Sequence, residues 1–395
     1  MVVSAVRRFL CSLAFYLGLC SLAGADVSQS KRVDLAAGYR AFSNDASAVE
    51  GSYNDSPYVK FEAEYDISSN GISLDTKIFY NWDKNDVSRR YYDVREALIA
   101  FHKGSWRFEA GRGLIFWGVS ETINVVNTLN QVDLSESVDG KTKTGQNMAT
   151  ASYAFSENTF TAYYLGDFEE IVYPDRPSPT IPISDVSRYE TEQNQHEYAL
   201  RWHGLFDFGE AAFSYFKGIR RDPLLVPAKS SSPLLEAYYI DTEYVSLEGL
   251  AFLGSAIVKF EGKLGEELDN TFSSYNIGFE YPTYPSFAMA QSIAWVFEYV
   301  HDSRKELAET MAQNDFFAGG RFSLGDFAQY DSRIILGYDL DHNSKYLDFS
   351  ITHRITDFIR WEAKLVQFID VGEFDDRLFF VQDEDFGQVE LHISF

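Results

Sequence analysis

Cysteine is almost absent from this sequence, and both copies lie within the first 25 residues. That segment carries two arginines ahead of an apolar run, and it closes on the small-residue motif Ala-Gly-Ala at Ala25. The pattern is typical of a cleaved secretory signal peptide, residues 1–25, and predicts export. Without Cys11 and Cys20 the mature chain has no thiol, which excludes a disulfide framework, a thiolate metal site and a cysteine nucleophile.

Excess positive charge and long apolar runs are missing as well. The chain holds 34 lysines and arginines against 59 aspartates and glutamates. Such acidity argues against nucleic acid as a partner, because its phosphates would be repelled. After the signal peptide, no window approaches the ~18 consecutive apolar residues of a transmembrane helix. There is no phosphate-binding glycine loop and no Cys/His metal spacing, so we expect no cofactor and no metal site.

The sequence is instead rich in aromatic residues, at 16%, and in stretches that alternate strictly between polar and apolar. The last nine residues, GQVELHISF, place Glu390 and His392 on one face of a strand and Leu391 and Ile393 on the other. A sandwich in the periplasm would alternate too. However, charges on one face of successive long strands, beside an aromatic face, favour an outer-membrane barrel with a wet lumen.

The connections between these strands alternate between short and long. Outer-membrane barrels show this asymmetry because their periplasmic turns are short and their extracellular loops are long. We count about eighteen strands, with sixteen as the alternative. The predicted fold class is therefore an all-β, transmembrane antiparallel up-and-down β-barrel over residues 26–395. Short turns are expected at 68–71, 102–105, 156–158, 246–249, 325–327 and 356–357, and long connections near 42–57, 83–91, 113–146, 168–194, 219–235, 262–270, 301–314 and 370–387.

The chain ends on Phe395, which the alternation places on the outward face. A C-terminal aromatic residue on an amphipathic last strand resembles the signal by which barrel proteins are recognised for outer-membrane assembly. The resemblance implies the cell outer membrane as the location. It also implies outer-membrane lipid, lipopolysaccharide and the barrel-assembly machinery as partners.

Residues 114–146 lose the alternation for over thirty residues but keep apolar positions such as Trp117. A long irregular connection usually carries function, and this one is too apolar for a disordered tail. We expect it to fold into the barrel and narrow the lumen, with opposed charges that create a transverse field. An inert plug, whose charges only satisfy one another, is the alternative. The acids expected at the constriction are Glu121, Asp133, Glu136 and Asp139, and the lumenal cations expected to face them are Lys60, Lys77, Arg107, Arg112 and Arg201.

Other charges are expected along the lumenal wall and in the external loops. Connections 167–192 and 370–385 are mostly acidic. Such clusters can bind hard divalent cations loosely, although a solvated loop is the commoner outcome. In both cases the mouth should repel anions. The further lumenal positions are Glu62, Arg360, Glu362 and Lys364.

Part of the long connection resembles a known family. The run Gly111-Arg112, Trp117-Gly118, Asn124, Asn127 and Asn130 looks like a segment of porin-like outer-membrane barrels of uncharacterised function in Gram-negative bacteria. Their version reads approximately G-R-Q, then W-G, then N-x-x-D-x-L-N. This chain has Gly113 in place of the usual Gln and Asn127 in place of the usual Asp. The resemblance covers about twenty-five residues and implies a porin-like barrel without naming a substrate.

Two functions from different classes fit this sequence. The first is a porin-like channel that passes small hydrophilic solutes passively, with a modest cation preference. The second is a closed-lumen barrel whose acidic external loops bind a surface polymer, a partner or divalent cations; a polymer-export porin is a variant of the first. An enzyme is not expected, because adjacent pairs such as His301-Asp302 point to opposite faces of a strand. The sequence does not indicate the substrate or the oligomeric state.

Overall fold

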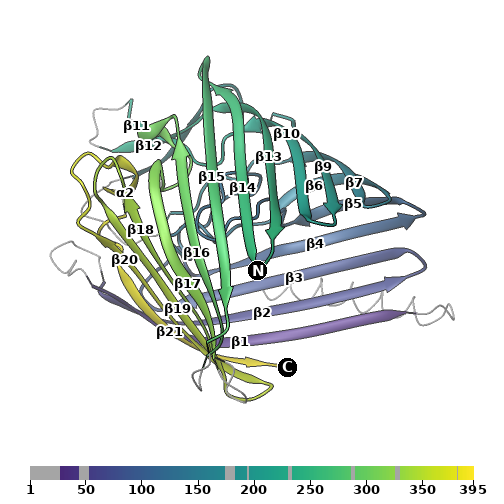
Figure 1. Ribbon diagram of the computed structural model, residues 1–395, viewed down its shortest axis with the longest axis horizontal. Coiled ribbons are helices and arrows are strands. Elements are labelled where there is room, and N and C mark those ends of the chain that lie inside the picture. The colour runs from purple at the N-terminus through teal and green to yellow at the C-terminus, as the bar shows by residue number, and fades with distance from the viewer. Residues whose placement is uncertain are drawn as a thin grey trace.

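The computed structural model describes residues 27–43, 53–173, 183–193, 195–229, 234–285, 290–324, 330–379 and 381–395. The predicted signal peptide lies outside these residues. Within them, eighteen strands form one closed antiparallel barrel (Figure 1), which confirms the predicted fold class and the larger of the two strand counts. The barrel strands are β1 (Ser28–Phe42), β2 (Asp55–Ser69), β3 (Ile72–Asp83), β4 (Tyr91–Lys103), β5 (Trp106–Gly113), β6 (Gln146–Phe155), β7 (Asn158–Gly166), β9 (Glu197–Phe206), β10 (Gly209–Ile219), β13 (Asp241–Leu253), β14 (Ala256–Glu267), β15 (Asn270–Thr283), β16 (Ala290–Asp302), β17 (Asn314–Leu324), β18 (Tyr330–Asp339), β19 (Lys345–Arg354), β20 (Ile359–Ile369) and β21 (Phe386–Ser394).

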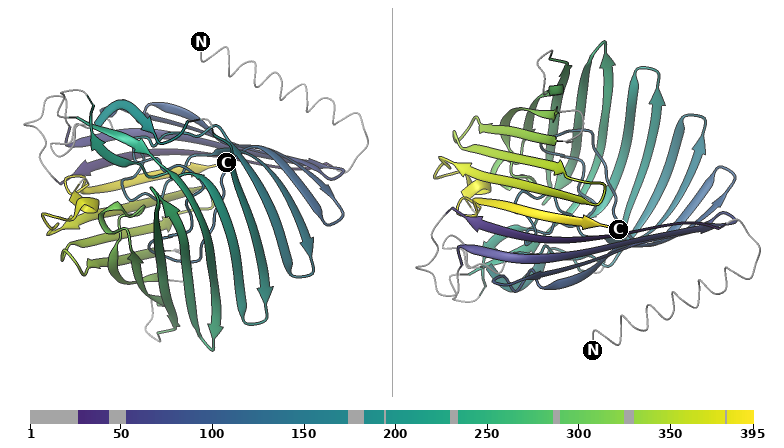
Figure 2. Two further views of the ribbon diagram at one scale, coloured as in Figure 1. Left: turned by 90° about the horizontal axis from the view of Figure 1, so that it is seen from above. Right: turned by 90° about the horizontal axis from the view of Figure 1, so that it is seen from below.

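The first and last strands close the barrel. β1 pairs antiparallel with β21, with Leu35 opposite Ile393, and Figure 2 shows the purple first strand beside the yellow last one. Closure removes both sheet edges, so no row of backbone donors and acceptors is left to face lipid. This explains why the chain can end on a strand.

The connections are short at one end of the barrel and mostly long at the other. The turn between β2 and β3 is Asn70-Gly71, whose φ angles of 51° and 79° suit a two-residue hairpin. Two predicted connections are wrong. Residues 246–249 lie inside β13, and the expected long loop 262–270 is mostly strand, with a turn of only Leu268 and Asp269. The turn predicted at 325–327 lies outside the described residues.

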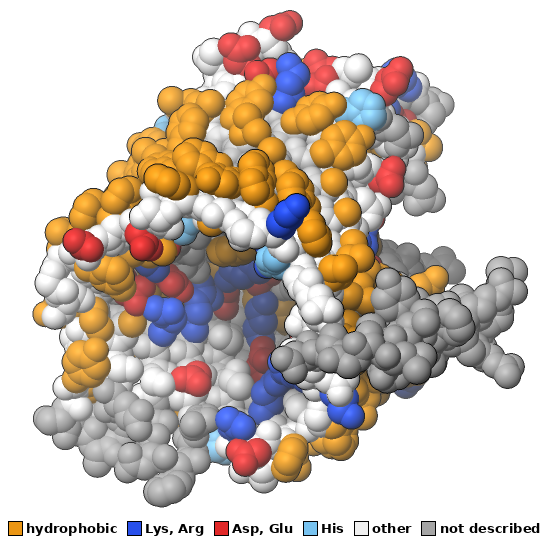
Figure 3. Space-filling view, turned by 90° about the vertical axis from the view of Figure 1, so that its right-hand side faces the viewer, with side chains coloured by type: hydrophobic (Ala, Val, Ile, Leu, Met, Phe, Trp, Pro, Cys, Tyr) orange, Lys and Arg blue, Asp and Glu red, His pale blue; other side chains and the backbone are white. Residues whose placement is uncertain are grey.

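The two faces of each strand meet different surroundings. On β21, Val389 and Leu391 are 56% and 45% exposed on the outside, whereas Glu390 and His392 are 5% and 7% exposed and point inward. Phe395 is exposed beyond the strand end. Figure 3 shows the outcome: apolar side chains cover the outside, and acidic and basic side chains line a hollow inside the barrel. An apolar exterior around a polar interior is what a transmembrane barrel requires.

The long loops build a small cap of their own. Strand β12 (Leu235–Tyr239) pairs antiparallel with β11 (Leu224–Pro227) and parallel with β8 (Ile183–Tyr189). Two short helical turns, η1 (Lys305–Leu307) and α2 (Asp376–Phe379), lie in other long loops. Among the described residues, no helix is long and apolar enough to cross a membrane.

Candidate functional site: a segment across the barrel lumen

Residues 114–145 join β5 to β6 and lie inside the barrel. Trp117, Val125 and Leu129 are at most 2% exposed, and they belong to one apolar cluster with Phe216 of β10 and Val296 of β16. The outer faces of these strands meet lipid, so an apolar cluster shared with them by the segment must occupy the lumen. We call residues 114–145 the lumenal segment.

Asn130 ties the two ends of the lumenal segment together. Its Oδ1 accepts a hydrogen bond from the Ile115 N–H at 2.8 Å, and its Nδ2 donates to the carbonyls of Thr144 at 2.8 Å and Gly113 at 3.2 Å. The side chain is fully buried. Because a buried amide without these partners would be costly, Asn130 fixes where the segment leaves and rejoins the wall.

The other motif asparagines hold local turns of the same segment. Asn127 Oδ1 accepts from the Trp117 N–H at 3.4 Å, and Asn124 Nδ2 donates to the Ser120 carbonyl at 3.2 Å. Gly118 has a φ of 116°, and a Cβ there would collide with the Asn124 side chain. The residues that carry the family resemblance therefore shape the lumenal segment, and a direct contact with a solute is not needed to explain them.

Arg112 lies in β5, just before the segment, and points toward another loop. Its Nε donates to the Val94 carbonyl at 2.7 Å, and its guanidinium pairs with Glu169 at 2.9 Å and Asp93 at 3.5 Å. Gly111, just before it, has a φ of 134° and no room for a Cβ against β4. Arg112 thus connects β5 to the connection after β7 and makes no ion pair with the segment's acids.

Glu136 anchors the second half of the lumenal segment, the part that follows Asn130, in a basic pocket of the wall. Its carboxylate lies 3.1 Å from Lys60 Nζ and accepts from Asn81 at 2.8 Å, and its carbonyl accepts from Arg40 at 2.7 Å. Burial raises the pKa of the Glu136 carboxyl, but Lys60, Arg89 and Arg40 outweigh burial and lower the pKa to about 2. The group is therefore ionised at neutral pH.

Asp139 and Asp133 make further contacts in the second half. Asp139 lies 2.6 Å from Lys364 Nζ, and its neighbour Lys141 pairs with Asp348 of β19. Burial raises the pKa of Asp139, but Lys364 and Lys141 outweigh burial, so the pKa lies well below its ordinary value. Asp133 accepts a hydrogen bond from Tyr91 at 2.7 Å.

Glu121 lies at the tip of the first half of the segment. Its carboxylate is 2.9 Å from Lys259 Nζ and 3.5 Å from Arg321, and Arg333 donates to its carbonyl at 3.0 Å. Burial raises its pKa, but Lys259 and then Arg321 outweigh burial and lower it. Arg333 also pairs with Asp348 at 2.9 Å, so both halves of the segment converge on this part of the wall.

Other predicted lumenal charges pair with groups outside the lumenal segment. On β20, Glu362 forms no ion pair within the described part of the chain. The wall pairs are Lys77 with Glu62 (3.1 Å) and Glu64 (2.8 Å), Arg107 with Glu109 (2.5 Å), Arg201 with Glu248 (2.5 Å) and Arg360 with Asp34 (3.4 Å).

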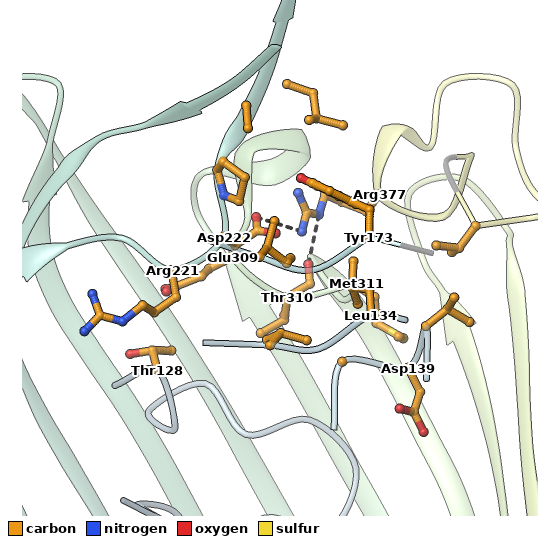
Figure 4. A pocket seen from close by; sticks show the side chains of 18 of the residues that line it. Thr128, Leu134, Asp139, Tyr173, Arg221, Asp222, Glu309, Thr310, Met311 and Arg377 are labelled. Carbon is orange, nitrogen blue, oxygen red and sulfur yellow. Dashed lines mark hydrogen bonds and ion pairs between the residues drawn. The ribbon is translucent and has the colours of Figure 1, made fainter. Parts of the chain in front are cut away.

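A cavity of about 1300 Å³ lies on the long-loop side of the segment. Its lining comes from the segment itself and from the connections after β7, β10, β16 and β20. Figure 4 shows Arg377 reaching Asp222 (3.1 Å) and the Thr310 carbonyl (3.0 Å), so three loops join across the cavity. No group of three or more His, Asp or Glu side chains in the described residues is placed to hold a metal ion.

Sequence reasoning missed the wall residues that hold the first half of the segment. Glu248, Glu261 and Glu298 accept hydrogen bonds from its backbone. The pattern that could have identified them is the alternation of polar and apolar residues. The stretches YVSLEGL and VKFEGKL place Glu248 and Glu261 on the polar face of their strands. That pattern identifies lumenal positions but not which of them the segment reaches.

No family model and no curated protein matches this chain in sequence. Solved structures match it along nearly its whole length. A BenF-like porin from Pseudomonas fluorescens Pf-5 has a TM-score of 0.56 at 8% identity, covering 94% of this chain and 98% of that one. OccAB1 from Acinetobacter baumannii gives 0.54 at 8% identity (94% and 96%), and OpdO from Pseudomonas aeruginosa gives 0.53 at 10% (94% and 96%).

The fold is that of outer-membrane porins. Together with the apolar outer face, this locates the chain in the bacterial outer membrane. At such low identity the likeness concerns the fold alone, and the lumenal segment has to be interpreted from its own contacts.

Proposed function

We propose that this protein is an outer-membrane channel through which small hydrophilic solutes pass passively, with a modest preference for cations. The observation that carries the proposal is the lumenal segment, which lies between the cavity on the long-loop side and the charged interior of the wall. Barrels of sixteen to eighteen strands leave an aqueous lumen unless something fills it. A segment that reaches the wall at both Glu121 and Glu136 narrows that lumen to a size that excludes large solutes.

The cavity is large enough to admit a small solute. At about 1300 Å³ it exceeds the ~300–1,000 Å³ of typical small-molecule sites. Charges of both signs surround the narrowed lumen. Glu121 lies beside Arg321 and Arg333 of the wall, and Asp139 and Lys141 of the segment line the same cavity. Such an arrangement orients polar solutes as they pass.

The cation preference rests on the charge of the cavity. Eight acidic and four basic side chains line it, and an excess of one sign raises the local concentration of the opposite ion. The acidic residues are Glu121, Asp139, Glu170, Asp222, Glu306, Glu309, Asp376 and Glu384, and the basic ones are Lys141, Lys143, Arg221 and Arg377.

Planar-bilayer recording of the mature protein in a salt gradient tests this proposal. We expect discrete conductance steps and a reversal potential on the cation side. The double variant E306Q/D376N removes two cavity carboxylates and should move the reversal potential toward anions. E373Q, an exposed loop position outside the cavity lining, is the matched control. An unchanged reversal potential in the double variant would refute the cation preference.

One observation favours a second candidate, a barrel with a closed lumen. Both halves of the lumenal segment bond to the wall, through Glu121 and Arg333 on one side and Glu136 and Lys60 on the other. If these contacts seal the lumen, the acidic external loops would bind a surface polymer, a partner or divalent cations. A folded barrel that never conducts would support this candidate, and passage of a polymer would indicate an export porin. Neither function requires catalysis by the protein, and lipopolysaccharide and the assembly machinery remain predicted partners in both.

A further inference from the structure

Three glutamates on nearby strands are buried inside the barrel, and two of them have little help from cations. Glu248 on β13 lies opposite Glu261 on β14, and Glu298 lies two strands further on β16. All three are at most 4% exposed. Arg201 pairs with Glu248, but within the described residues neither Glu261 nor Glu298 has a basic group within 4.0 Å. A buried carboxylate needs compensation, so another group must supply it.

Backbone N–H groups of the lumenal segment supply that compensation. Glu261 accepts from the amides of Val119 (2.6 Å), Ser120 (2.7 Å) and Val125 (3.0 Å). Successive amides that converge on an anion form a strong site for negative charge. The amides of the segment therefore hold the Glu261 side chain through three hydrogen bonds.

Glu298 repeats the arrangement one residue further along the segment. Its two oxygens accept from the amides of Glu121 (2.7 Å) and Thr122 (2.9 Å), and Thr122 Oγ1 donates to it as well. Asn276 Nδ2 donates to the same carboxylate at 3.1 Å and to the Ile123 carbonyl at 2.7 Å. The bonds to Glu261 and Glu298 thus cover every amide from 119 to 122.

Apart from these amide bonds, the tip (residues 118–122) is held mainly through Glu121, whose carboxylate pairs with Lys259 and whose carbonyl accepts from Arg333. Ile123, Val125 and Val126 lie in the apolar cluster, whereas residues 118–121 are partly exposed and do not belong to it. Gly118 permits the close approach, since a Cβ there would stand 2.7 Å from Glu261 Oε1 and 1.7 Å from Asn124 Oδ1. The position of residues 118–122 therefore depends on the wall carboxylates together with the contacts of Glu121.

We propose that Glu261 and Glu298 are positioning residues that hold residues 118–122 against the wall, thereby setting the width of the lumen and placing the Glu121 charge beside it. This inference rests on the proposed channel function, which it deepens by naming the residues that fix the constriction. If the tip is released, lumenal water can hydrate both carboxylates, so the open arrangement is accessible to the folded barrel.

The test combines hydrogen exchange with conductance on the full mature protein. The isosteric variant E261Q/E298Q turns two acceptors into N–H₂ groups that face the segment's own donors. Because an unmade buried hydrogen bond costs about 1–3 kcal/mol, the amides of 119–122 should exchange at least about fivefold faster than in the wild type. The conductance step should rise, and the cation preference should change. E362Q, a lumenal glutamate on β20 without an ion pair in the described residues, is the control for hydrogen exchange and should leave the exchange of 119–122 unchanged.

T122V serves as a second variant in case the double variant does not fold. It deletes one hydroxyl that donates to Glu298 and leaves the wall intact, so a smaller acceleration of the same amides is expected. Unchanged exchange at 119–122 in both folded variants would overturn the anchoring role. Faster exchange with an unchanged conductance step would overturn the role in setting the width. Faster exchange when no form conducts would instead overturn the proposed channel function.

Discussion

The two halves of the lumenal segment are held by different chemistry. In the first half, backbone amides bind the wall carboxylates Glu261 and Glu298 and apolar side chains pack beside them, with Glu121 as its ion-paired side chain. In the second half the segment's own side chains form ion pairs, Glu136 with Lys60 and Asp139 with Lys364. The first arrangement depends mainly on backbone geometry, and the second depends mainly on side-chain charge.

This difference predicts how each half responds to substitution. Backbone amides cannot be removed by an ordinary side-chain change, so the first half is sensitive at the wall and at positions that shape the turn, such as Gly118. The second half is sensitive at the segment itself, because one lost carboxylate leaves several buried cations facing one another. The following variants test this contrast.

E136Q should have the largest effect on stability. It removes a buried charge that Lys60, Arg40 and Arg89 surround, and breaking such a group costs about 3–5 kcal/mol. The midpoint of urea unfolding of the refolded barrel measures the loss. E64Q is the control, since Glu64 is a more exposed partner of Lys77 and its loss should cost at most about 1 kcal/mol. Equal losses in the two variants would contradict the account of the second half.

The same group has a defined pH dependence. The pKa of Glu136 is lowered from 4.5 to about 2 in the folded protein. A lowered carboxyl pKa means that the stabilisation is complete above about pH 4.5 and is lost as the pH falls toward 2. The wild-type midpoint should therefore fall more steeply than that of E136Q between pH 4.5 and 2.

N130A should cost about 1–3 kcal/mol, because Asn130 makes three hydrogen bonds while fully buried. It should also speed proteolysis within the segment, whose two ends lose their connection. N270A is the comparison, since Asn270 makes one exposed hydrogen bond to the Leu268 carbonyl and should cost no more than about 0.5 kcal/mol. A loss as small as that of N270A would show that the motif does not shape the segment.

The smallest expected effect concerns Lys143, at the end of the second half. Burial lowers the pKa of its amine to about 8, so its positive charge is lost between pH 7 and pH 9. Because Lys143 lines the acidic cavity, this loss should shift the reversal potential further toward cations by a few millivolts. K143M should show no such shift over this range, whereas K84M, at an exposed loop position, should behave as the wild type.

Alternation in the sequence was sufficient to predict the barrel but not every connection. SLEG at 246–249 and the stretch 262–270 contain Gly249, Gly262 and Gly265, which read as turns although they lie within strands. In the barrel these glycines make room for neighbours: a Cβ at Gly262 would stand 2.8 Å from the Phe260 ring, and one at Gly265 would clash with Glu243. The pattern of one strand does not show which side chains of the neighbouring strands lie beside a glycine.

The site was predictable only in part for a related reason. Loss of alternation identified the lumenal segment and the acidic residues within it. The partners of these acids could not be predicted, because they depend on which strands lie opposite in the barrel. Lys60 and Lys364 form ion pairs with the segment, whereas Arg107 and Arg201 form theirs with glutamates of the wall. Glu261 and Glu298 accept hydrogen bonds from backbone N–H groups, and such contacts cannot be predicted from residue types.

The central claim is that residues 114–145 narrow an open lumen. The most direct measurement is the bilayer conductance of the mature protein beside a variant that lacks residues 116–143, both checked for folding by heat-modifiable mobility. The account predicts discrete steps in the wild type and a severalfold larger step in the deletion variant. Equal steps, or steps in neither folded protein, would contradict it.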